Sequence, residues 1–156
     1  MLVNENANQN LLKCIFIVAF LVALPDKLTA QVPEIPDPNF PDIAAVAPHP
    51  QYGAVIIYNP IICQQIGAAC NFFRAHEYGH INLGHHLLHT SAYRLEKEAQ
   101  ADCYAAQTAN SNDIFAAVQL FLNYQKSFDW RIYGNPIERA NRVRTCAIQA
   151  GKWIGK

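Results

Sequence analysis

Hydrophobic and polar positions follow a helical period over most of the chain after residue 60. Between Ile114 and Lys126 the apolar residues cover one broad face, and strong helix formers fill Arg94 to Gln107. A short helix at 61–67 and a last helix from Pro136 past Cys146 are also expected. The pattern predicts a mainly helical chain.

The segment Tyr52 to Tyr58 differs, because it is rich in β-branched and aromatic residues and is ended by Asn59-Pro60. It predicts one strand, at the edge of a sheet or in its core. The fold class is therefore α+β and predominantly helical. Residues 31–50 carry six prolines, which exclude a helix or a central strand. We expect an extended leader there, draped on the domain or acting as a tether, and a domain at 51–156.

The N-terminus contains an apolar run from Cys14 to Leu24, followed by the small-residue end Thr29-Ala30. This run is too short to span a bilayer comfortably but suits the core of a secretory signal peptide. Residues 1–30 are interpreted as a signal peptide cleaved after Ala30, with an uncleaved anchor as the alternative. The predicted location is the periplasm or the exterior, with no membrane association after cleavage.

Residues 76–80 spell HEYGH, an HExxH motif in a helix for which Asn71 is the expected N-cap. Side chains four apart share one helix face, so His76 and His80 can bind a single ion. Glu77 lies beside that ion and can hold and deprotonate a metal-bound water. An amphipathic helix with two half-buried histidines is the alternative.

A second motif, ExxxD, begins eighteen residues after His80 in the next expected helix. Catalytic zinc requires three protein ligands and one open position, and Glu98 can supply the third ligand. Asp102, one turn further on, can accept the N–H of a ligand histidine, His76 in our interpretation. The two motifs predict one zinc ion per chain.

With these motifs the chain resembles the gluzincin metallopeptidases, and most of all the family of the HtpX and CAAX prenyl proteases with its small soluble relatives, the minigluzincins. The resemblance covers about Tyr52 to Gln107. It implies a compact zincin-like domain in which a small edge-strand sheet packs on the active-site helix. It also implies that Glu77 is the general base, and that an edge strand pairs with an extended substrate. The strand at 52–58 is the one available for that role.

Three further histidines, His85, His86 and His89, offer a rival ligand set. The metzincin pattern would use His86, but it needs a glycine where Leu83 stands and a methionine beneath the zinc. Met1 is the only methionine, so that pattern is excluded. The three histidines are interpreted as a polar cluster at the mouth of the site, with a metal or substrate role as the alternative.

The C-terminal region departs from the family pattern, in which a His-Pro often precedes a final helix that contains an arginine. Here the dipeptide is Asn135-Pro136, and Arg139 and Arg142 are the candidates for the arginine. Tyr133 is a candidate donor for the oxyanion formed during peptide hydrolysis. Simple aromatic packing is the alternative for Tyr133.

Cysteine usage supports export, since Cys63, Cys70, Cys103 and Cys146 remain after signal cleavage. Four cysteines allow three connectivities. We expect the pairs Cys63–Cys70 and Cys103–Cys146, because the second would clamp the ExxxD helix to the last helix. Four reduced cysteines are the alternative, although an exported protein favours oxidation.

Two functions are consistent with these features. The first is an exported zinc endopeptidase acting on a peptide or protein substrate. The second is a non-catalytic periplasmic zinc- or peptide-binding protein of the same fold. A formal net charge of zero without a basic cluster argues against nucleic-acid binding.

Overall fold

The computed structural model describes residues 32–88, 93–123 and 133–155, which belong to one compact unit, Gln31–Lys156. The interpreted signal peptide lies outside the described residues. Within the ranges just given, no helix combines the length and the apolar character needed to cross a membrane.

A small mixed sheet is built from β1 (Glu34–Pro36), β2 (Ala44–His49) and β3 (Gly53–Tyr58), in the order β1-β3-β2. β1 runs parallel to β3, and β2 runs antiparallel to it. The β2–β3 hairpin closes with His49 opposite Gly53, whose φ of 73° lies in the region that favours glycine.

The sheet decides between the alternatives for two segments in the first part of the domain. The strand at 52–58 exists as β3, but it is the central strand, and β2 is the edge strand next to α2. The proline-rich segment 31–50 is extended and lies on the domain, where it supplies both edge strands of the described sheet. Proline cannot donate to a central ladder but is tolerated at an edge, where Pro48 lies.

The described helices are α1 (Pro60–Ile66), α2 (Ala69–Asn82), the 3₁₀ turn η1 (His85–Leu87), α3 (Arg94–Thr108), α4 (Ser111–Asn123) and α6 (Pro136–Gln149). α1 and α6 begin alike: the Asn59 and Asn135 side chains accept backbone N–H bonds, and proline follows each. Asn71 is not the N-cap of α2, because the turn at Gly67 starts the helix at Ala69.

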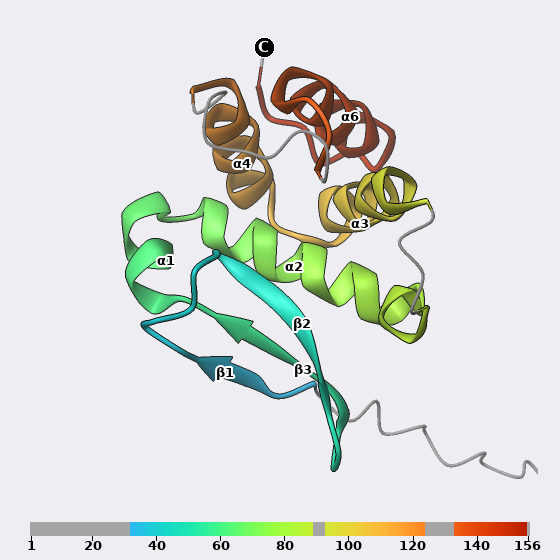
Figure 1. Cartoon of the computed structure of the whole chain (residues 1–156). Helices are drawn as coiled ribbons and strands as arrows, with labels where there is room; N and C mark the ends of the chain where they lie inside the picture. The colour runs from blue at the N-terminus through green and yellow to red at the C-terminus, as the bar shows by residue number, and fades with distance from the viewer. Residues whose placement is uncertain (1–31, 89–92, 124–132, 156) are drawn as a thin grey trace, which may run out of the picture. The chain divides into compact units, whose positions relative to one another are not determined.

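α2 lies between two layers, with the sheet on one side and α3, α4 and α6 on the other (Figure 1). The hydrophobic core fills the helical side, where Phe72, Phe73 and Phe121 meet edge to face. The fold is thus α+β and mainly helical, as expected. Burial on both sides fixes α2, the helix that carries the HExxH motif.

Candidate metal centre

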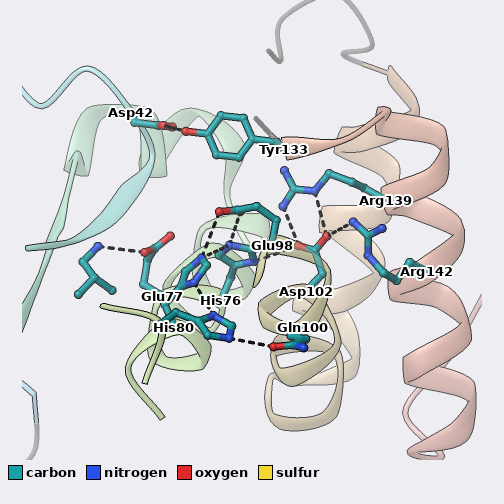
Figure 2. A network of polar contacts seen from close by, with 12 residues as sticks. Asp42, His76, Glu77, His80, Glu98, Gln100, Asp102, Tyr133, Arg139 and Arg142 are labelled. Carbon is teal, nitrogen blue, oxygen red and sulfur yellow. Dashed lines mark hydrogen bonds and ion pairs between the residues drawn. The ribbon is translucent and has the colours of Figure 1, made fainter. Parts of the chain in front are cut away.

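Two helices bring three possible metal ligands together (Figure 2). His76 and His80 lie one turn apart on α2, with their Nε2 atoms 3.0 Å from each other. Glu98 reaches across from α3, placing Oε2 3.1 Å from Nε2 of His76 and Oε1 3.5 Å from Nε2 of His80. The three ligand atoms lie within 4.8 Å of one another.

These separations fit a small tetrahedral ion. Ligand atoms about 2.0–2.1 Å from a tetrahedral zinc are roughly 3.3 Å apart, and the distances of 3.0, 3.1 and 3.5 Å bracket that value. His76 and Glu98 are only 3% and 9% exposed. Unprotonated nitrogen atoms and carboxylate oxygens that face one another in a buried site are stabilised by a shared cation. The group could therefore hold a metal ion.

In the metal-free protein a proton serves as that cation. Burial alone would lower the pKa of His76, but hydrogen bonds to Asp102 and Glu98 raise it to about 10. Burial would raise the pKa of Glu98, but the hydrogen bond from His76 and the neighbouring His80 lower it to about 2. The site therefore attracts positive charge strongly enough to outweigh desolvation.

Asp102 is fully buried, and it receives bonds from three side chains. His76 donates from Nδ1 to Oδ1 at 2.9 Å, the contact expected from the ExxxD motif. Arg139 donates from two nitrogens, at 3.0 and 2.6 Å, and Arg142 from one at 2.8 Å. Both candidate arginines of the last helix thus bind Asp102. The hydrogen bond from His76 and the guanidinium of Arg139 hold the pKa of Asp102 well below its usual range, against the effect of burial.

His80 has a corresponding partner, which the sequence did not indicate. Its Nδ1 lies 3.0 Å from Nδ1 of His85, and Nε2 of His85 lies 2.9 Å from Oε1 of Gln100. His86 lies with Nδ1 3.5 Å from the backbone carbonyl oxygen of His80 and lines the cavity. His89 lies outside the described residues. His85 is therefore not simply a polar residue at the mouth of the site.

Glu77 points beside the three ligands, toward β2 (Figure 2). Its Oε2 accepts the backbone N–H of Val46 at 3.0 Å. Burial raises its pKa, although His76 and His80 oppose the shift. The carboxylate is thus held in place by the edge strand, a contact between residues 31 positions apart that no motif indicates.

A cavity of about 430 Å³ opens over these groups and is bordered by β2, η1, α3 and Tyr133. Tyr133 lies at its wall, but its hydroxyl donates to Oδ2 of Asp42 at 3.2 Å (Figure 2). Burial and the Asp42 carboxylate raise the pKa of Tyr133 to about 12. In this arrangement the hydroxyl is bonded to Asp42, so the oxyanion role remains a hypothesis.

Gly79 allows α3 to approach α2 closely enough for Glu98 to reach the histidines. A Cβ at this position would lie 3.1 Å from Cα of Ala101 and 3.1 Å from Cβ of Tyr104. Those contacts are tighter than ordinary packing, so a larger residue would push the two helices apart. The second variable position of HExxH thus has a steric role.

Two disulfides, Cys63–Cys70 and Cys103–Cys146, confirm the expected pairing. The first joins α1 to α2, and the second joins α3 to α6. Cys103 directly follows Asp102, so the second bridge anchors the turn of α3 that meets Arg139. Two disulfides are consistent with an extracellular or periplasmic protein.

Comparison with models of protein families, with curated proteins and with solved structures found no match to this chain. The metal centre therefore rests on its geometry, and the resemblance to gluzincins remains an expectation from the two motifs.

Proposed function

We propose that this chain is an exported zinc-dependent endopeptidase of the gluzincin type. The observation that carries the proposal is the position of Glu77, a buried carboxylate beside three candidate ligands and facing a cavity. A site that only stores metal has no use for such an acid. This feature favours the peptidase over a non-catalytic zinc- or peptide-binding protein.

Zinc is the proposed metal because two histidines and one glutamate form a known catalytic zinc set. When bound, zinc would act as a Lewis acid toward a carbonyl and would lower the pKa of water. His76, His80 and Glu98 would be its ligands, one ion per chain. Asp102 supports this role, because its bond to Nδ1 leaves Nε2 of His76 available for the metal.

Glu77 would act as the general base and then as the general acid. Its raised pKa brings it closer to that of a group which accepts and returns protons near neutral pH. It would take a proton from the attacking water and deliver it to the leaving amine. The Val46 N–H would keep the carboxylate aimed into the cavity throughout.

β2 is the proposed docking edge for an extended peptide. It bonds to β3 along one side, and its other side borders the cavity through Ala44, Val46 and Pro48. Extended peptides bind such edges by backbone hydrogen bonds. This assigns to β2 the role that the sequence had suggested for the strand at 52–58.

Two variants test the proposal on purified protein lacking residues 1–30. Glu77→Gln should retain zinc but lose cleavage of a peptide library by roughly a hundredfold to ten-thousandfold. Glu138→Gln is the matched control, an exposed glutamate on α6 that should cleave normally. Equal cleavage by Glu77→Gln and the parent would refute the mechanism.

Metal content tests the ligand set separately. Elemental analysis should find about one zinc per chain in the parent protein and little in Glu98→Ala. Full occupancy in Glu98→Ala would refute the assignment of that ligand. Zinc binding without cleavage of any library peptide would favour the binding-protein alternative.

A further inference from the structure

A line of side-chain contacts leads from His80 away from the metal group. Nδ1 of His80 meets Nδ1 of His85 at 3.0 Å, and Nε2 of His85 meets Oε1 of Gln100 at 2.9 Å. The Gln100 amide continues the line, because its Nε2 donates to Oε1 of Glu96 at 3.3 Å. Four residues from α2, η1 and α3 are thus joined end to end.

The direction of these bonds is fixed by the glutamate at the far end. An ionised carboxylate only accepts hydrogen bonds, so Gln100 must turn its NH₂ group toward Glu96 and its oxygen toward His85. His85 must then carry its proton on Nε2, and a neutral imidazole has no second proton for Nδ1. Nδ1 of His85 is therefore an acceptor.

The position of the proton on His80 follows from these bonds. Because Nδ1 of His85 accepts, Nδ1 of His80 must donate and must carry the proton. A neutral His80 then has no proton on Nε2, the atom that faces His76 and Glu98.

We propose that His85 and Gln100 are positioning residues that hold His80 in its Nδ1–H tautomer, so that Nε2 is available to bind the metal. They would do for His80 what Asp102 does for His76. The proposal rests on the metal site of the proposed function, but it does not require peptide cleavage. Neither residue belongs to the HExxH or ExxxD positions that define the motifs.

The test uses two variants at an exposed position of α3, where misfolding is not expected. Gln100→Met removes the acceptor for His85. The exchange Glu96→Gln with Gln100→Glu restores it, because a carboxylate at position 100 can accept from both neighbours. Gln107→Met is the matched control, the same change at an exposed position later in α3.

Zinc affinity, measured by competition with a chromophoric chelator, should fall about tenfold to a hundredfold in Gln100→Met. The exchange variant and Gln107→Met should stay within about threefold of the parent, well inside that loss. A purely structural role for Gln100 would not be rescued by the exchange.

Long-range ¹H–¹⁵N correlation spectra of the histidine rings give an independent readout. The parent protein should show His85 as the Nε2–H tautomer and His80 as the Nδ1–H tautomer, with and without zinc. An Nδ1–H tautomer at His85, or unchanged zinc affinity in Gln100→Met, would overturn the proposal. A parent that shows the expected tautomers but binds no zinc would refute the metal assignment and support the orientation of His80.

Discussion

Replacing Asp102 by alanine should damage the protein in two separable ways. The side chain is fully buried, and it neutralises Arg139, which is itself only 2% exposed. It also accepts the Nδ1 proton of His76. The ion pair with Arg139 affects the stability of the fold, and the hydrogen bond from His76 affects the binding of the metal.

The size of the stability loss follows from these contacts. Removing one partner of a buried ion pair costs about 3–5 kcal/mol, because the remaining charge is uncompensated. Arg142 does not face the same penalty, since 27% of its side chain is exposed. Domains of this size are stable by roughly 5–15 kcal/mol. Asp102→Ala should therefore lose a large part of its stability without being obligatorily unfolded.

Adding Arg139→Met should recover part of that loss. The variant no longer buries an unpaired charge, and methionine can keep the packing that Arg139 makes over Phe121, 4.6 Å from the ring centroid. The buried N–H of His76 still lacks its acceptor, which costs about 1–3 kcal/mol. That cost is the same in the single and the double variant, so the recovery should match the removed charge penalty, up to about 3–5 kcal/mol.

Urea denaturation in the presence of a chelator measures the first effect, and zinc competition measures the second. Zinc affinity should fall about tenfold to a hundredfold in Asp102→Ala and should not return in the double variant. Recovery of zinc affinity together with stability would refute the separate roles. A loss below about 1 kcal/mol in the single variant would contradict the buried ion pair.

Two further predictions concern pH and the disulfides. The pKa of His76 in the folded, metal-free protein is raised from 6.5 to about 10, so its stabilising contribution is complete below pH 6.5 and is lost as the pH rises through 10. The pKa of Glu98 is lowered from 4.5 to about 2, so its contribution is present above pH 4.5 and is lost as the pH falls through 2. Urea midpoints of chelator-treated protein should therefore be highest between pH 4.5 and 6.5, and a midpoint that rises from pH 7 to 9 would contradict this. Replacing the pair Cys103 and Cys146, 43 positions apart, should cost about 4 kcal/mol by loop entropy, against about 2.5 kcal/mol for Cys63 and Cys70, 7 apart. Thermal unfolding of the two double-serine variants shows which disulfide contributes more to stability. Only the loss of Cys103–Cys146 should also weaken zinc binding.

The sequence predicted the metal group well because its residues follow simple helix geometry. A spacing of four places His76 and His80 on one face, and the same spacing relates Glu98 to Asp102. Gln100 and His85 could not be predicted in this way, since they are joined to His80 by side-chain contacts among the separate elements α2, η1 and α3. Contacts between separate elements leave no periodic signal in one sequence.

The sheet shows the same limit. β3 was predicted from its β-branched and aromatic residues, whereas β2 contains alanine and proline and gives a weak strand signal. Strand order depends on pairing, which local composition does not encode. The residue of β2 that matters most for the site, Val46, contributes through its backbone N–H, so its side chain carries no trace of that role.

These contacts make α3 the element on which the site depends most. It supplies the candidate ligand Glu98, the direct partner of His76, which is Asp102, and, through Gln100, the indirect partner of His80. The three residues are two positions apart along the helix, so a small movement of this turn would disturb all of them together. Gly79 sets the distance of the turn from α2, and the Cys103–Cys146 bridge ties it to α6. The Cys103–Cys146 disulfide and the buried carboxylate of Asp102, which binds two arginines of α6, therefore both restrain the turn of α3 that carries these residues.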